Sequence, residues 1–138
     1  MLKKERELST YRYALAEETL IAAKTCIANG LYRDCINRSY YAVFYAVKAV
    51  IVLGGVDFKR HKDVVAYFNK EYVAGGIFPR ELGKRLGRLQ ALRETSDYND
   101  FYVASKEEAS NQLETVEYAM RLIKVYLIDK DIFREGSS

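Results

Sequence analysis

Residues 32–53 read YRDCINRSYYAVFYAVKAVIVL and contain the longest apolar run of the chain. Large apolar residues recur in it at three- and four-residue intervals, the spacing of one face of an α-helix. They fall on two stripes: Ile36, Tyr40, Val43, Val47 and Val50 on one, and Tyr41, Phe44 and Ile51 on the other. A helix that is apolar on nearly every side must be covered on nearly every side. We therefore predict a central, buried helix over residues 32–53.

The same spacing predicts one helix before this stretch and three after it. The first runs to about residue 29, the second of the three begins at Pro79, and the last has a seam that suits antiparallel packing or a dimer. The apolar positions behind these predictions are Leu8, Tyr11, Leu15, Ala22 and Cys26; His61, Val64, Phe68 and Tyr72; Leu82, Leu86, Leu89 and Leu92; and Leu113, Val116, Met120, Ile123 and Leu127.

Turn residues separate these helices. Gly30 suits a left-handed cap at the end of the first helix, and Pro79 suits a first helical position. Residues 96–100 (SDYND) predict a break, and Ser105 with Glu108 forms the capping-box pattern that opens a last helix. The remaining glycines at helix ends are Gly54, Gly55, Gly75 and Gly76.

These elements predict an all-α fold, an up-and-down antiparallel bundle of four to five helices. With 138 residues, of which 49% are hydrophobic, the chain can bury a core as one domain. We assign residues 1–130 to that domain and residues 131–138 to a C-terminal tail.

Composition bounds where the protein works. The apolar run over residues 40–53 is interrupted by Lys48 and is shorter than the ~20 residues that span a bilayer, so we expect no membrane association. The N-terminal residues lack the apolar core of a signal peptide. Cys26 and Cys35 lie in apolar helical segments, which favours reduced core thiols and a cytoplasmic protein.

The sequence lacks the usual patterns for metals and nucleotide cofactors. Its single histidine, His61, and its widely spaced cysteines do not provide the three or four ligands of a transition-metal site. A glycine-rich phosphate loop is also missing. We therefore expect no metal and no cofactor.

A basic stripe marks the fourth predicted helix. Arg80, Lys84 and Arg88 repeat every four residues and could follow a phosphate backbone, while tyrosines could stack on bases. A solvated basic face is the simpler explanation, because the net charge is only +3.

Four further residues are candidates for function. Arg38 lies in the most apolar predicted helix, so we expect a buried guanidinium that needs a partner, either the Asp97 carboxylate or a phosphate of RNA or a nucleotide. Arg93 and Tyr98 flank the predicted break, which must reorient them if both are to meet one phosphate. His61 begins a helix, where a capping or core role competes with proton transfer.

Several of these residues together resemble a known family. Residues 16–18 (AEE), 30–34 (GLYRD), 37–46 (NRSYYAVFYA), 59–61 (KRH) and 93–100 (RETSDYND) resemble, in order and spacing, the HEPN-domain proteins of the UPF0332 group. The resemblance covers roughly residues 8–128 and is most specific where the Arg-x-Tyr-Tyr-Ala and Asp-Tyr elements occur together.

The resemblance implies a homodimeric helical bundle, often encoded beside a minimal nucleotidyltransferase. Active members are metal-independent ribonucleases with an Arg-x4-6-His motif. Two such motifs meet at the dimer interface, where the arginine stabilises the phosphate and the histidine transfers the proton.

This sequence departs from that motif. The residue five positions after Arg93 is Tyr98, and the residue seven positions after Arg38 is Tyr45, where relatives often carry histidine. Tyrosine, with an unperturbed pKa of about 10, is a poor general base. His61 is a substitute, and partner nucleotidyltransferases in some such systems adenylylate a tyrosine near the motif, which makes Tyr98 a candidate modification site.

Three hypotheses follow. The first is a ribonuclease-like toxin with Arg93, Asp97, Tyr98 and His61 as catalytic residues and Arg38, Arg80, Lys84 and Arg88 as RNA or phosphate ligands. The second is a catalytically silent dimer that binds a nucleotidyltransferase or another protein. The third is nucleotide binding by the arginines of a dimer cleft.

Overall fold

The structure is a computed structural model that describes residues 3–133. These residues form five α-helices and no strand, which confirms the all-α prediction. The helices are α1 (Lys3–Ala28), α2 (Tyr32–Ile51), α3 (His61–Phe68), α4 (Arg80–Tyr98) and α5 (Lys106–Asp129). A 3-10 turn (Val52–Gly54) extends α2, and a π-helical turn (Asn69–Val73) extends α3.

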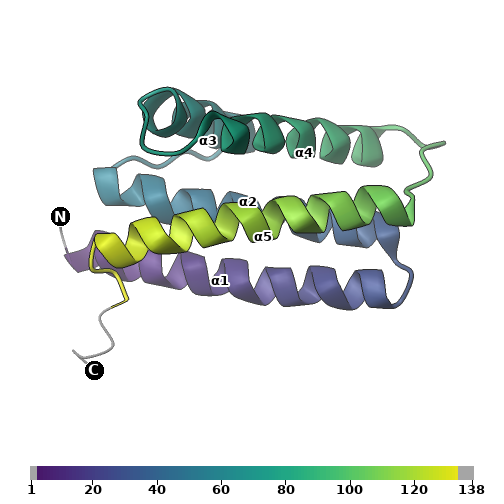
Figure 1. Ribbon diagram of the computed structural model, residues 1–138, viewed down its shortest axis with the longest axis horizontal. Coiled ribbons are helices and arrows are strands. Elements are labelled where there is room, and N and C mark those ends of the chain that lie inside the picture. The colour runs from purple at the N-terminus through teal and green to yellow at the C-terminus, as the bar shows by residue number, and fades with distance from the viewer. Residues whose placement is uncertain (1–2, 134–138) are drawn as a thin grey trace.

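The four long helices form an up-and-down bundle in which α2 is central. It contacts α1, α3, α4 and α5, as the sequence predicted for its most apolar helix. Successive long helices run in opposite directions, so α2 and α5 run the same way, while the short α3 lies at one end beside the start of α4 (Figure 1). The predicted seam of α5 is buried within the chain, largely against α2.

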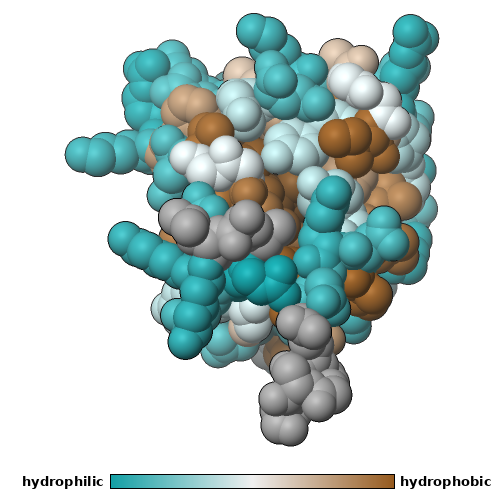
Figure 2. Space-filling model, turned by 90° about the vertical axis from the view of Figure 1, so that its left-hand side faces the viewer, coloured by the Kyte–Doolittle hydropathy of each residue, from teal (hydrophilic) through white to brown (hydrophobic). Residues whose placement is uncertain are grey.

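Burial explains the position of α2. Twelve of its residues are buried, and Ile36, Val47, Val50 and Ile51 have no exposed surface. Burying each such side chain contributes on the order of 1.5–3 kcal/mol to folding. Long hydrophilic side chains surround smaller apolar areas on the end of the molecule where α1 begins and α5 ends (Figure 2).

The predicted helix ends are largely confirmed. Gly30 has a φ of 75°, and the amide of Leu31 donates to the Cys26 carbonyl at 2.8 Å, as in a Schellman cap. Pro79 directly precedes α4. Ser105 and Glu108 form the predicted capping box, which opens α5.

The break predicted at residues 96–100 was placed too early. α4 continues to Tyr98, and the Asn99 amide still donates to the Thr95 carbonyl at 3.1 Å. The irregular segment begins only at Asn99. The turn-forming residues Ser96 and Asp97 are therefore helical, because the buried face of α4 holds this segment against the bundle.

Other predictions concern the cysteines, the tail and the membrane. Both cysteines are free thiols, with Cys35 buried and Cys26 half-buried. Of the predicted tail, Ile132 is buried and the Phe133 ring lies 5.3 Å from the Tyr13 ring, whereas residues 134–138 are outside the described residues. Among residues 3–133, none of the helices combines the length and apolarity that crossing a bilayer requires.

Candidate functional site

Four aromatic side chains of α2 form a cluster at the place where α3 and α4 approach it. We call Tyr40, Tyr41, Phe44 and Tyr45 the aromatic cluster. The ring centroids of Tyr40 and Tyr41 lie 5.4 Å apart, and those of Tyr41 and Tyr45 lie 6.2 Å apart. Tyr40 and Phe44 are buried, whereas Tyr41 and Tyr45 are half-buried. The cluster therefore has a covered floor and a partly accessible edge.

His61, the first residue of α3, packs onto this cluster. Its ring centroid lies 3.9 Å from that of Phe44, 5.3 Å from that of Tyr41 and 5.6 Å from that of Tyr40. Burial lowers the pKa of His61 below its usual 6.5, and the positive charges of Arg93 and Lys48 lower it further. The imidazole is therefore mainly neutral near pH 7 and can accept a proton.

Arg93 reaches the same tyrosines from α4. Its guanidinium carbon lies 5.1 Å from the ring centroid of Tyr40 and 5.7 Å from that of Tyr41. A terminal guanidinium nitrogen donates a hydrogen bond to the Tyr41 hydroxyl at 3.2 Å. Because Arg93 and His61 share two aromatic neighbours, residues from α3 and α4 meet at one place on α2.

Asp97 holds Arg93 from one turn further along α4. The Arg93 Nε and Asp97 Oδ2 atoms are 2.9 Å apart, an ion pair in which Nε lacks the alignment of a hydrogen bond. Burial acts to lower the pKa of Arg93, but Asp97 and the hydroxyls of Tyr41 and Tyr40 outweigh it, and the pKa is raised. The guanidinium therefore stays charged in a side chain that is only 19% exposed.

Tyr40 is an unsuitable base in this site. Burial raises the pKa of Tyr40 to about 12, although the charge of Arg93 acts in the opposite direction. Its hydroxyl therefore keeps its proton near neutral pH. Among the titratable groups of the cluster, the imidazole of His61 is the better proton acceptor.

Lys48 adds a second positive charge beside His61. Its ammonium lies 5.4 Å from the Phe44 ring and 3.4 Å from an Asp57 carboxylate oxygen, and that carboxylate also accepts a hydrogen bond from Arg12 at 2.8 Å. Burial acts to raise the pKa of Asp57, but Arg12 and Lys48 hold it below its usual value. These contacts tie the loop before α3 to α1 and α2.

The structure corrects the prediction for Arg38. Its side chain is exposed rather than buried, and Asp97 pairs with Arg93 instead. Arg38 falls at the edge of α2 that also carries Tyr41, three residues later, because residues at this spacing are neighbours on a helix. A role for Arg38 in phosphate binding remains a prediction.

Tyr98 lies apart from Arg93. Because α4 is unbroken between them, five residues at about 100° each separate their directions by ~140°. The Tyr98 side chain is 79% exposed. The structure therefore does not bring Tyr98 into the site with Arg93 and His61.

The basic stripe is also separate from the site. Arg80, Lys84 and Arg88 are exposed, whereas Leu82 and Leu86 of the same helix are buried. The step from Arg88 to Arg93 again turns α4 by ~140°. The stripe therefore faces solvent on the side of α4 away from the aromatic cluster.

Two participants were missed in the sequence. Tyr41 was assigned to a core stripe, yet its hydroxyl is the hydrogen-bond partner of Arg93. Lys48 was noted only as an interruption of the apolar run, and a charge in such a run was the signal that could have identified it. Within residues 3–133, three or more His, Cys, Asp or Glu side chains do not gather in any arrangement that could hold a metal ion.

Comparison with known proteins places this geometry in context. The family model described as the HEPN domain matches residues 10–126. A UPF0332 protein of Thermotoga maritima is 33% identical over 129 residues, which cover 94% of this chain and 97% of the relative.

Two similar proteins of Methanocaldococcus jannaschii are named as candidate toxins. One is 30% identical and covers 86% of this chain and 81% of its own length. The other is 32% identical and covers 80% of this chain and 82% of its own length. The similarity to all three relatives extends over most of both chains.

Proposed function

The chain belongs to the HEPN domain family, and from this we propose that it is the toxin-like half of a two-component system that binds and cuts RNA. The observation that carries the proposal is the meeting of Arg93 and His61 on Tyr40 and Tyr41. The names of the M. jannaschii relatives support a toxin-like role.

The proposed chemistry uses the two residues in different roles. Arg93 binds a phosphate oxygen and neutralises the charge that grows on it as the bond to phosphorus forms. His61 takes the proton of the ribose 2′-hydroxyl, and the 2′ oxygen attacks phosphorus. The bond to the 5′ oxygen breaks, a water molecule gives that oxygen a proton, and a 2′,3′-cyclic phosphate remains.

The other charged residues support binding in this proposal. Asp97 orients Arg93, and Arg38 contacts a neighbouring phosphate from the edge of the aromatic cluster. A second copy of the chain completes the cleft, so that two such sites lie side by side. Arg80, Lys84 and Arg88 then guide more distant phosphates along the outer face of α4.

The proposed partner is a minimal nucleotidyltransferase in the cytoplasm. Tyr98 is accessible to such an enzyme because its side chain is 79% exposed. Transfer of a nucleotide to its hydroxyl would add negative charge at the C-terminal end of α4 and oppose RNA binding there. Tyr98 is thus a modification site in this proposal rather than a catalytic base.

A second candidate function is a catalytically silent dimer that binds a nucleotidyltransferase or another protein. The observation in its favour is that Arg93 is already engaged by Asp97 and Tyr41, and His61 by Phe44.

A third candidate function is nucleotide binding at Arg38 and Arg93. It predicts that ATP raises the melting temperature and that Arg38→Ala and Arg93→Ala remove the effect.

An RNA-cleavage time course in EDTA with mapped product ends tests the proposed function. We expect wild type to produce 2′,3′-cyclic phosphate ends, His61→Gln to be slower by roughly 10²–10⁴-fold, and Tyr98→Phe to match wild type. Intact RNA in every sample, together with a stable complex with a co-expressed nucleotidyltransferase, supports the silent dimer instead.

A further inference from the structure

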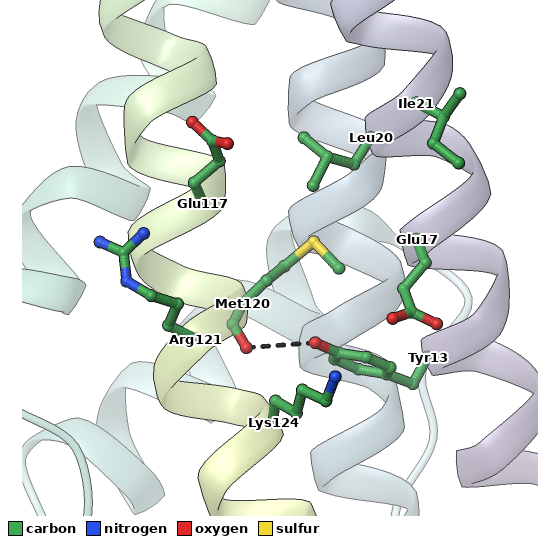
Figure 3. A pocket seen from close by; sticks show the side chains of 8 residues that line it. All are labelled: Tyr13, Glu17, Leu20, Ile21, Glu117, Met120, Arg121 and Lys124. Carbon is green, nitrogen blue, oxygen red and sulfur yellow. Dashed lines mark hydrogen bonds between the residues drawn. The ribbon is translucent and has the colours of Figure 1, made fainter.

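A groove runs between α1 and α5 on the side of the bundle away from the Arg93 site. Both helices pack on α2 and leave two adjoining hollows of about 350 and 400 Å³. The hollows share Tyr13, Glu17 and Lys124, so they form one continuous groove. Figure 3 shows the hollow of about 350 Å³, with α1 on one side and α5 on the other.

The floor of the groove is apolar and its margins are exposed. Leu20 and Met120 face each other across it, and the Tyr13 hydroxyl is satisfied by the Met120 carbonyl at 3.2 Å (Figure 3). Ile21 on α1 is 65% exposed and Ile128 on α5 is 55% exposed. Covering these side chains would remove apolar surface from water.

The charges beside the floor have a regular arrangement. On α1, Glu17 and Lys24 lie seven residues apart, and on α5, Glu117 and Lys124 do the same. Seven residues are about two turns, so each pair lies on one face ~10 Å apart. Lys24 Nζ pairs with Glu117 Oε2 at 3.2 Å, whereas Glu17 and Lys124 line the groove without an ion pair between them.

This pattern is complementary to itself. Each helix carries a negative and a positive charge on either side of an apolar centre, Leu20 on α1 and Met120 on α5. Consider a second copy related to the first by a 180° rotation about an axis that runs across the groove, perpendicular to both helices, at the level of Leu20 and Met120. Every positive charge of one copy then meets a negative charge of the other. An isologous contact between identical chains requires this kind of self-complementarity.

We propose that a second copy of the chain docks on this groove, with α1 against α1 and α5 against α5 in antiparallel orientation. Lys24 of each copy then faces Glu17 of the other, and Glu117 of each faces Lys124 of the other. The intrachain pair between Lys24 and Glu117 joins these contacts into a network of four charges at each end of the apolar centre.

Arg121 does not oppose this arrangement. It lines the groove near the centre, but its side chain points away from α1 (Figure 3), so the two guanidinium groups lie outside the covered strip. The contact uses α1 and α5, whereas the Arg93 site uses α2, α3 and α4. The contact through α1 and α5 therefore goes beyond the proposed function. If a second copy also covers the Arg93 site, the two contacts together predict an assembly larger than a dimer.

Sedimentation equilibrium of the full chain at several concentrations tests the proposal. We expect Ile21→Glu to weaken one step of self-association by about tenfold or more, because it places a charge in the apolar centre. Tyr11→Glu is the matched control. Tyr11 is also 65% exposed, but it lies about 180° around α1 from Leu20, so association should be unchanged.

Charge reversal tests the register. Glu17→Lys alone should weaken association, because it sets two lysines against each other in each α1 contact. The quadruple variant with Glu17→Lys, Lys24→Glu, Glu117→Lys and Lys124→Glu should restore association, since the charges of every pair are inverted together. If the natural occupant of the groove is instead a helix of another protein, self-association should not depend on these four residues.

Cross-linking gives a second measurement that does not depend on affinity. Ile21 lies near the proposed axis, so Ile21→Cys should form a disulfide-linked dimer mapped to position 21, and Tyr11→Cys should not. The proposal is overturned if wild type is monomeric at all concentrations, or if Ile21→Glu and Tyr11→Glu weaken association equally. It is also overturned if the quadruple variant fails to restore the association that Glu17→Lys removes. The Ile21→Glu and charge-reversal outcomes do not alter the predictions for RNA cleavage, whereas a monomeric wild type would also count against the dimer cleft of the proposed function.

Discussion

The two faces of α4 carry arginines in different surroundings. On the inner face, Arg93 is 19% exposed and contacts Asp97 and two tyrosine rings. On the outer face, Arg80 and Arg88 are exposed to solvent. One basic helix therefore holds two kinds of cation: one fixed by a carboxylate and aromatic rings, and others that contribute a diffuse positive field.

The largest expected effect is on the free energy of unfolding, because only the inner face of α4 is packed in the core. Leu86 on the inner face is 2% exposed, so Leu86→Ala should lower the free energy of unfolding by about 2–5 kcal/mol. Arg88→Ala, two residues away on the outer face, should change it by less than ~0.5 kcal/mol. Urea denaturation followed by circular dichroism measures both, and equal losses would contradict the assignment of the faces.

The next effect concerns RNA cleavage. Arg93→Ala should reduce the rate by roughly 10²–10³-fold, as expected when a positioned charge is removed from a phosphoryl site. Arg88→Ala should keep the rate at saturating RNA and weaken binding mainly at low salt, because the contact that it removes is screened at high salt. If both variants lose the same fraction of the saturated rate, Arg93 has no special position.

A smaller effect compares two ion pairs on the same helix. Arg93 with Asp97 and Arg85 with Glu81 are both four residues apart, but the first pair is less exposed. Asp97→Asn should cost about 1 kcal/mol or less and be little affected by salt. Glu81→Gln should leave the melting temperature unchanged, and thermal melts at low and high salt distinguish the two.

The smallest effect is on the pH dependence of stability. Because the pKa of His61 is lowered in the folded chain, the unfolded chain binds its proton more readily, and stability falls as the pH drops below about 6.5. His61→Gln should remove this contribution. Denaturation midpoints of wild type and variant between pH 5 and 8 should therefore diverge only on the acid side. Parallel curves would place His61 in contact with water.

Much of the fold follows from local patterns. The all-round apolar character of α2 predicted its central position, and Gly30, Pro79 and Ser105 predicted helix ends. These features depend on neighbours in sequence, which a pattern can represent. The end of α4 could not be predicted from the local pattern, because packing of its inner face overrides the turn preference of Ser96 and Asp97.

The site was less predictable for the same reason. Arg93, Asp97 and His61 were named from the sequence, but their meeting depends on how α3 and α4 pack on α2. Arg38 was expected to be buried because its helix is apolar, yet it falls on the exposed edge of that helix. Residues such as Tyr41, which belong to both the core and the site, cannot be assigned by periodicity alone.

The most direct test of the account uses the single histidine. Titration of His61 by NMR should give a pKa below 6.5 in wild type, a higher pKa in Arg93→Ala, and the wild-type pKa in Arg88→Ala. That result would establish that Arg93 and His61 form one electrostatic site. An identical pKa in all three proteins would contradict it.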